Sequence, residues 1–209
     1  MIKTKPQTLI VDNKYCPGCG HGTILNNLLH AVQDMNIDPS NMCMVSGIGC
    51  SARISGYVDF HSMHTMHGRA LACATGIKMT KPELNVVVPM GDGDAMAIGG
   101  NHFIHACRRN IDMVAIIMNN RIYGMTGGQM APTSLVGQVT QTSPYGRKAE
   151  TAGIPIRVSE MLATLDGAAY IERVAVNNPA NMAKAKAAIK KAFKMQLEGK
   201  GFTMVEVLS

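Results

Sequence analysis

The sequence predicts an α/β fold in which helices cover both faces of a mostly parallel sheet. Two short apolar runs, at residues 85–90 and 112–118, contain β-branched side chains and do not alternate with polar residues. Such runs are typical of strands buried on both faces. Each leads into a polar cluster, and open α/β sheets bind their ligands where parallel strands end. Strand and helix patterns alternate without a repeat or linker, which indicates a single domain over residues 1–209.

The composition is that of a globular protein with a sizeable core. The chain has 209 residues, of which 46% are hydrophobic. No apolar run approaches the ~18 to 20 residues that a membrane span needs, and the first residues lack a signal-peptide core. We therefore expect a cytoplasmic protein that does not enter a membrane. In that compartment, six cysteines indicate metal or redox chemistry before disulfides.

The formal net charge of +6 owes much to lysines gathered in residues 184–200. We interpret this segment as the solvated face of a helix. A basic chain could also bind nucleic acid, which is the more specific interpretation. However, the sequence offers few aromatic residues on which bases could stack: it has four phenylalanines, five tyrosines and no tryptophan. A basic protein also suits an acidic redox partner.

The first half of the chain is expected to begin with a helix over residues 23–35, whose apolar residues recur at helical spacing. A strand over 41–46 follows and ends in a glycine-containing loop. Residues 61–70 carry three histidines and are expected to lead into a helix of small residues through Thr80. Small residues allow such a helix to pack closely on the sheet.

The second half is expected to hold a long polar loop, two short helices, and a final strand, helix and strand. We expect the loop at 127–134 to act as a lid or a partner-facing surface. The remaining elements are a helix over 147–152, a helix capped by Ser159 and reaching Asp166, a strand over 170–176, a helix from Pro179 to about Glu198 stopped by Gly199 and Gly201, and a strand over 202–208.

A diphosphate and metal cradle is predicted after the strand at 85–90. Gly91 and Gly93 let the backbone turn and approach a phosphate, while Asp92 offers a hard oxygen to a divalent cation. The helix starting near Asp94 directs its amino end at the anion. The amide oxygen of Asn120 and the carbonyl of Ile122 complete the set from the next strand end. The spacing from Gly-Asp-Gly to Asn-Asn resembles the thiamine diphosphate motif.

Cysteines and basic residues suggest further chemistry. Cys16 and Cys19 could point at one soft metal centre, and a zinc knuckle, a thiol redox pair, an iron–sulfur corner and two unliganded cysteines all fit that spacing. Cys50 is a candidate third ligand. We interpret the other three cysteines, Cys43, Cys73 and Cys107, as buried residues with a structural role.

Arg53 follows Cys50 on the same loop and either grips a substrate carboxylate or is a surface arginine. His61, His64 and His67 could suggest zinc, but neither a helical spacing nor a companion carboxylate supports it. We favour His67 and Arg69 as phosphate or substrate contacts at the amino end of a helix, with His64 supportive or neutral.

Five segments together resemble the β subunits of 2-oxoacid:ferredoxin oxidoreductases, in that family's order and over essentially the whole chain. They are CPGCGHG at 16–22, GIGCS at 47–51, HTMHGR at 64–69, GDGD at 91–94 and NNRIYGMTGGQ at 119–129. The sequence looks closest to the 2-oxoglutarate or 2-oxoisovalerate type. The resemblance implies a thiamine diphosphate-binding fold, with an iron–sulfur ligand segment around residues 15–22.

The resemblance also implies oxidative decarboxylation of a 2-oxoacid with coenzyme A to an acyl-CoA, carbon dioxide and reduced ferredoxin. It assigns Mg²⁺ to Asp92, Asn120 and the Ile122 carbonyl, and a [4Fe–4S] cluster to Cys16, Cys19 and Cys50. The other cofactor contacts that it implies are Gly49, Cys50, Ser51, His67, Gly68, Gly91, Gly93, Asp94, Gly124, Met125 and Thr126. The implied catalytic residues are Arg53, at a substrate-contact position, His67 and Arg69.

Two departures from the family pattern set further expectations. The family supplies a fourth cluster cysteine shortly after the final strand, where this chain stops at Ser209. We expect a fragment, which could lack the cluster and still fold. The glutamate that activates the cofactor comes from the α subunit in this family. The chain is therefore expected to need an α or α/γ partner for activity.

Two other classes of protein share parts of the pattern. A non-redox thiamine enzyme, of the decarboxylase or transketolase type, would use the central cradle without needing Cys16, Cys19 and Cys50. A non-enzymatic module could hold zinc on Cys16 and Cys19 and bind nucleic acid through the lysine segment. Iron–sulfur absorbance would exclude the non-redox thiamine enzyme, and tight zinc stoichiometry with no thiamine diphosphate binding would favour the non-enzymatic module.

Overall fold

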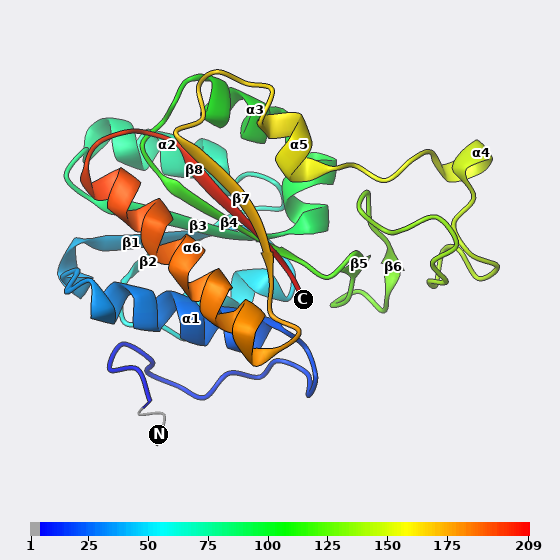
Figure 1. The fold of residues 1–209 in the computed structure, drawn as a ribbon, viewed down its shortest axis with the longest axis horizontal. Helices are drawn as coiled ribbons and strands as arrows, with labels where there is room; N and C mark the ends of the chain where they lie inside the picture. The colour runs from blue at the N-terminus through cyan, green and yellow to red at the C-terminus, as the bar shows by residue number, and fades with distance from the viewer. Residues whose placement is uncertain (1–4) are drawn as a thin grey trace.

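A six-stranded parallel sheet forms the centre of the molecule in the computed structural model, which describes residues 5–209 (Figure 1). The strand order is β2-β1-β3-β4-β8-β7, and every neighbouring pair runs parallel. The strands are β1 (Met42–Ser46), β2 (His61–His64), β3 (Asn85–Gly91), β4 (Val114–Asn119), β7 (Tyr170–Ala175) and β8 (Thr203–Leu208). The predicted α/β fold is confirmed.

Helices cover both faces of this sheet. One face packs against α1 (His21–Asp34) and α6 (Pro179–Leu197), and the other against α2 (Ala70–Thr80), α3 (Gly100–Arg108) and α5 (Val158–Leu162). Shorter turns complete the chain: 3-10 segments at Pro39–Asn41 and Ser51–Gly56, a π-helical turn at Asp94–Ile98 and the short α4 at Ala149–Ala152. Within the described residues, no helix is both long and apolar enough to cross a membrane.

Strand β4 explains why its sequence shows no alternation. Val114 and Ile116 belong to the core under α1 and α6, whereas Ala115 and Ile117 belong to the core on the opposite face. All four side chains are buried. A strand that is covered on both faces gains from apolar residues at every position, about 1.5–3 kcal/mol for each large one.

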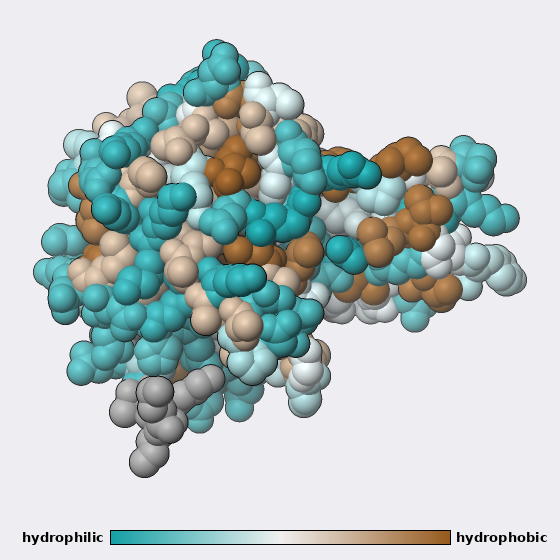
Figure 2. Space-filling model, in the orientation of Figure 1, coloured by the Kyte–Doolittle hydropathy of each residue, from teal (hydrophilic) through white to brown (hydrophobic). Residues whose placement is uncertain are grey.

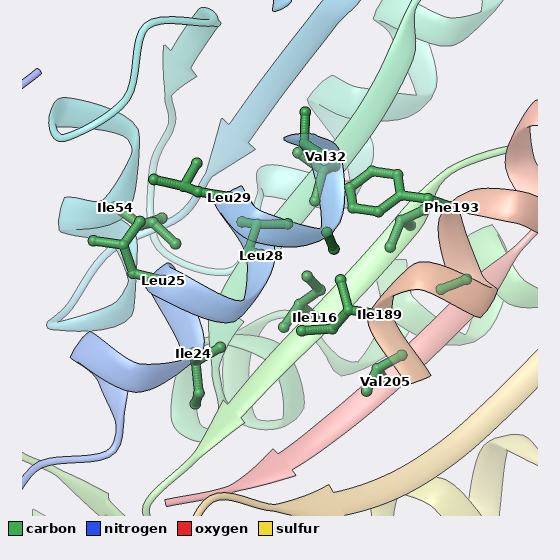
Figure 3. Close-up of a cluster of buried hydrophobic side chains, with 14 of the residues drawn as sticks. Ile24, Leu25, Leu28, Leu29, Val32, Ile54, Ile116, Ile189, Phe193 and Val205 are labelled. Atoms are coloured by element: carbon green, nitrogen blue, oxygen red, sulfur yellow. The ribbon is translucent and has the colours of Figure 1, made fainter. Parts of the chain in front are cut away.

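The core under α1 and α6 shows how the two helices meet the sheet (Figure 3). Leu25 and Leu28 of α1 and Ile189 and Phe193 of α6 are completely buried. They lie against a sheet surface that includes Ile116 (Figure 3). The helical spacing of these apolar residues thus produces one continuous layer, and the lysines of α6 are left on its other side.

The boundaries of α6 follow from its sequence. Asn178 is the N-cap, and its side-chain oxygen accepts a hydrogen bond of 2.8 Å from the Asn181 N–H. Pro179 occupies the first turn, where its missing N–H costs nothing. Gly199, with φ of 63°, follows the helix in the left-handed region that favours glycine.

The helix predicted to follow residues 61–70 and to end at Thr80 is α2, but residues 61–64 also form the edge strand β2, whose four residues are exposed and which the sequence did not predict. One local prediction was wrong. Ser159 does not cap α5, because Arg157 occupies the N-cap and Ser159 is the second residue of the helix, which ends at Leu162 rather than Asp166. Its hydroxyl instead donates a 2.5 Å hydrogen bond to the buried carboxylate of Glu206, an acceptor that the local sequence does not reveal.

Residues 120–157 leave the carboxyl edge of the sheet and form an extension that we call the arm (Figure 1). It contains the two-residue strands β5 (Ile122–Tyr123) and β6 (Gln129–Met130), which pair antiparallel, and α4. Brown apolar side chains are visible along it in Figure 2. The large exposed apolar residues of the arm are Met125, Leu135, Val136, Val139, Tyr145, Ile154 and Ile156.

Candidate active site

A cavity opens at the carboxyl ends of β1, β3 and β4, where the sheet order places these strands side by side. It is lined by residues from the glycine-containing loops that follow each strand. Of the predicted cofactor contacts and magnesium ligands, it gathers Gly49, Cys50, Ser51, His67, Gly91, Asp92, Gly93, Asp94, Asn120, Ile122, Gly124, Met125 and Thr126. Gly68 lies just behind them, with its N–H on the carboxylate of Asp94.

Asp92 follows β3 directly and is 1% exposed. The Thr133 hydroxyl donates a hydrogen bond to its carboxylate. Burial raises the pKa of Asp92 to about 6, against the lowering effect of Thr133 and of nearby backbone N–H groups. A buried carboxylate that is costly to ionise alone is well suited to a divalent cation.

Asn120 and Ile122 bring uncharged oxygens to the same cavity. The Asn120 side-chain oxygen accepts a 3.3 Å hydrogen bond from the Ile122 N–H, which turns the chain tightly after β4. Arg121 between them has φ of 62°, an uncommon conformation for a residue other than glycine. One carboxylate, one amide oxygen and one carbonyl form a hard-oxygen donor set of the type that Mg²⁺ uses.

Two glycines of the cavity are required for different reasons, Gly93 for close packing and Gly49 for its backbone conformation. A Cβ on Gly93 would lie 2.2 Å from Cε1 of Tyr123, so only glycine permits this packing. Gly49 has φ of 113° and no heavy atom within 4 Å of a Cβ position, so its backbone faces open space. The buried hydroxyl of Ser51 has no hydrogen-bond partner among the described residues. Accessible backbone and a free donor fit a phosphate group.

Asp94 ties three loops together. Its Oδ1 accepts hydrogen bonds from the N–H of Gly68 at 2.7 Å and of Ile48 at 3.3 Å, and lies 2.7 Å from Nδ1 of His67. Burial raises the pKa of Asp94, while the Gly68 N–H and His67 oppose that rise. One oxygen of the carboxylate therefore organises the cavity wall, while the other, Oδ2, is buried with no hydrogen-bond partner among the described residues.

The three predicted cluster cysteines are free thiols that lie near one another. Cys16 is exposed, Cys19 and Cys50 are half-buried, and Cys50 lines the cavity. Burial raises the pKa of Cys50, and the nearby thiols of Cys19 and Cys16 raise it further. Among the described residues, no three His, Cys, Asp or Glu side chains gather tightly enough for a single ion. A four-iron cluster holds its sulfurs farther apart than one ion does, so the cluster assignment stays a prediction.

Arg53 and Arg69 lie outside the cavity. Arg53 is exposed in the 3-10 turn Ser51–Gly56 and lines a neighbouring open pocket with Lys14 and His64. Arg69 precedes α2, and its Nη1 lies 3.2 Å from Nε2 of His102. Of the three predicted catalytic residues, only His67 lines the cavity.

Three residues of the site were not assigned a role from the sequence. His21 is buried, lines the cavity and has its Nδ1 3.2 Å from the Cys19 sulfur. Burial lowers its pKa to about 4, so the ring is neutral near pH 7. Tyr123 lines the cavity beside Gly93. Thr133 reaches Asp92 from the arm, across a sequence separation of 41 residues that no local pattern encodes.

Comparisons with known proteins agree with this geometry. Residues 41–207 match the family described as thiamine pyrophosphate enzyme, C-terminal TPP binding domain. The chain is 49% identical over 203 residues to the 2-oxoglutarate synthase subunit KorB of Archaeoglobus fulgidus, which covers 97% of this chain and 71% of the relative. The ketoisovalerate oxidoreductase subunit VorA of Methanothermobacter marburgensis is 42% identical over 93% of this chain and 41% of its own length.

A solved structure gives the same result in three dimensions. The 2-oxoglutarate:ferredoxin oxidoreductase from Magnetococcus marinus superposes with a TM-score of 0.85 and 37% identity, over 100% of this chain and 68% of that chain. The family match, these relatives and the confirmed sheet all agree with the resemblance carried by the five sequence segments. The chain therefore belongs to the β subunits of the 2-oxoacid:ferredoxin oxidoreductases, with a thiamine pyrophosphate-binding domain.

Proposed function

We propose that this chain is the thiamine diphosphate-binding subunit of an enzyme that oxidatively decarboxylates a 2-oxoacid. The 2-oxoacid and coenzyme A give an acyl-CoA and carbon dioxide, and the electrons reduce ferredoxin. The observation that carries the proposal is the cavity lined by Asp92, Asn120 and Ile122 at neighbouring strand ends. Their oxygens suit a magnesium diphosphate, and the family match supports that cofactor.

The residues of this chain have separate tasks in the proposed reaction. Asp92, Asn120 and the Ile122 carbonyl hold Mg²⁺, while the backbone around Gly91 and Gly93 receives the diphosphate. When bound, thiamine diphosphate supplies the carbon nucleophile and the electron sink that decarboxylation requires. His67, fixed by Asp94, presents its ring to the cavity as a polar contact.

We propose that Cys16, Cys19 and Cys50 hold a [4Fe–4S] cluster that removes the electrons. Support comes from the mutual proximity of the three thiols and from the position of Cys50 on the cavity wall. The non-redox alternative leaves these cysteines without a task.

A partner subunit belongs to this proposal. The family draws the activating glutamate from the α subunit, and the exposed apolar side chains of the arm supply a surface that a partner would cover (Figure 2). The basic charge of the chain suits an acidic ferredoxin. Free cysteines agree with the proposed cytoplasmic location.

The names of the relatives and two arginine side chains bear on which 2-oxoacid is the substrate. The 2-oxoglutarate synthase relatives favour 2-oxoglutarate, and the VorA relatives keep 2-oxoisovalerate as the alternative. Arg53, in its basic pocket beside the cavity, remains the proposed substrate contact, and Arg69 a second basic contact. Their guanidinium groups are suited to a carboxylate that arrives with the substrate.

The test is anaerobic co-expression of the full-length chain with its α partner, followed by ferredoxin or viologen reduction with a panel of 2-oxoacids. Reduction that requires both coenzyme A and one of the acids is the expected result and identifies the substrate. Bound thiamine diphosphate with no iron and no reduction would favour the non-redox thiamine enzyme instead.

A further inference from the structure

Farther along the arm, Thr133 and Ser134 come back to the segments that carry the proposed metal ligands. Thr133 is 4% exposed, and its hydroxyl donates to Oδ2 of Asp92. The next residue, Ser134, is completely buried, and its hydroxyl donates a 2.5 Å hydrogen bond to the carbonyl of Arg121. Asn120 and Ile122 flank Arg121 in the chain. The adjacent pair Thr133 and Ser134 therefore contacts both halves of the proposed magnesium site.

Arg147 holds this pair in place. Arg147 is 5% exposed, and its guanidinium donates from Nη1 to the carbonyls of Ala131, Pro132 and Ser134, at 3.2, 3.1 and 2.7 Å. Nε and Nη2 donate to the carbonyls of Gly153 and Ala152, at 3.0 and 2.9 Å. One planar side chain thus fixes the backbone on both sides of Thr133, and five carbonyls satisfy its charge.

The Arg121 carbonyl accepts a second hydrogen bond, from the side-chain amide of Gln138 at 3.0 Å. Arg121 itself has a positive φ, which an L-residue keeps only when its surroundings hold it. The turn that carries Asn120 and Ile122 is thus held by two donors from farther along the arm, Ser134 and Gln138. A metal site with one carboxylate depends strongly on how its uncharged oxygens are directed.

We propose that Thr133 and Ser134 form a clasp that positions the ligands of the metal: Thr133 orients the carboxylate of Asp92, and Ser134 fixes the turn that carries Asn120 and Ile122. The inference rests on the proposed function, because it takes these three residues as the Mg²⁺ ligands. Outer-shell hydrogen bonds of this kind change metal affinity by about 10–100-fold. The clasp adds residues 133–134 to the part of the arm that already lines the cavity.

The experiment measures how thiamine diphosphate binding depends on the metal, in the full-length chain co-expressed with its partner. Calorimetric titrations over a range of Mg²⁺ and Ca²⁺ concentrations are compared for the wild type, Thr133→Val and Thr133→Ser. Thr140→Val is the matched control, because this buried threonine of the same arm bonds to Ser143 instead of Asp92. Thermal unfolding of each variant reports its fold.

We expect Thr133→Val to raise the Mg²⁺ concentration for half-saturation by about 10-fold or more, and Thr133→Ser to restore it. The Ca²⁺ dependence should change less, because Mg²⁺ demands stricter octahedral geometry. A purely structural role would lower the unfolding temperature and leave the preference between the two ions unchanged.

Two results would overturn the inference and are distinguishable. If Asp92→Ala abolishes metal-dependent binding while Thr133→Val behaves like Thr140→Val, the clasp is wrong and the proposed function stands. If Asp92→Ala binds thiamine diphosphate with wild-type Mg²⁺ dependence, the metal site is misassigned and the clasp falls with it.

Discussion

Asp92 is the residue on which the proposed site depends, because it supplies the one charged oxygen of the donor set. We expect Asp92→Ala to weaken Mg²⁺-dependent binding of thiamine diphosphate by more than about 100-fold, the upper end for outer-shell partners. The fold should persist, since the change removes a carboxylate that is costly to bury. Calorimetry of cofactor binding, together with thermal unfolding, measures both effects.

Asp112→Ala is the control for that experiment. Asp112 forms an ion pair of 2.9 Å with Lys78 and does not line the cavity. Its loss should leave cofactor binding unchanged. Equal losses of affinity in the two variants would show that Asp92 acts through the fold rather than as a ligand.

Gly93 tests how closely the cavity wall is packed. Its φ of −67° suits alanine, but the new Cβ would meet the Tyr123 ring at 2.2 Å. We expect Gly93→Ala to lower the free energy of unfolding by about 1–3 kcal/mol, the usual cost of overpacking. Denaturant titrations of the single variants and of Gly93→Ala with Tyr123→Ala check this.

Because the clash disappears when the ring is removed, the double variant should lose less stability than the sum of the two single losses. Additive losses would mean that Tyr123 already moves freely out of the way. Gly76→Ala is a suitable control, because a Cβ there would meet no atom within 4 Å.

At the residue scale, the sequence predicts site residues that directly follow a recognisable strand. It misses residues whose role depends on contact with a distant segment of the chain. Asp92 and Asn120 can be found because each directly follows a recognisable strand. Thr133 and His21 cannot, because their roles arise only when folding brings distant segments together. The structure adds a task for Asp94 that the sequence did not indicate: one oxygen of its carboxylate joins the loops through the N–H groups of Gly68 and Ile48.

At the scale of elements, the arm owes its path to Arg147. Arg147→Met removes a donor from five carbonyls, of which those of Ala131 and Pro132 keep a backbone N–H. We expect the loss to cost about 1–3 kcal/mol for each of the other three, those of Ser134, Ala152 and Gly153, that stays buried. Water will solvate some of them, so local opening of the arm should become easier by at least about 2 kcal/mol. Hydrogen exchange resolved by segment measures the change.

Exchange should accelerate within residues 120–157 and stay unchanged in β1 and β3, which pack in the core. Arg157→Met is the control, since Arg157 is an exposed arginine that directly precedes α5. Uniform acceleration over the whole chain would mean that Arg147 stabilises the domain rather than the arm.

The elements predicted well are those whose sequence reflects their burial. Strands β3, β4 and β8 could be recognised because apolar residues at nearly every position have no other soluble arrangement. Strand β2 could not, because an exposed edge strand of four residues carries no burial pattern. The wrong cap at Ser159 has a similar cause: Glu206, which binds its hydroxyl, lies 47 residues away in the sequence.

At the scale of the whole molecule, the parallel sheet brings chemistry from distant segments to one edge. The loops after β1, β3 and β4 meet there because these strands are neighbours in the sheet order. Two apolar layers, one on each face, hold the strands in register. The cavity can therefore stay polar and rich in glycine, since the stability of the domain comes from elsewhere.

Global stability should also depend on pH through an ion-pair network at β7 and β8. Arg173 joins Glu160 on α5, at 2.7 Å from Nη1, to the buried Glu206 on β8, at 2.8 Å from Nε. The hydrogen bond from Arg173 is the main cause that lowers the pKa of Glu160 from 4.5 to about 2. Between these values the unfolded chain binds more protons than the folded one.

The contribution of Glu160 is therefore fully present above pH 4.5 and is lost as the pH falls toward 2. Because its side chain is 52% exposed, solvent screening limits that contribution to below about 1 kcal/mol. Glu160→Gln should unfold more easily than the wild type at pH 6, and the difference should shrink by pH 3. Denaturant titrations across this range measure the two free energies of unfolding.

Glu150→Gln supplies the comparison, since Glu150 forms no ion pair with the residues that the structure describes. Its effect should be small at every pH, which separates the Arg173 interaction from the general loss of one negative charge in a basic protein. A difference for Glu160→Gln that stays constant from pH 6 to pH 3 would contradict the linkage, because it would mean that the carboxylate stabilises the fold through packing and not through its charge.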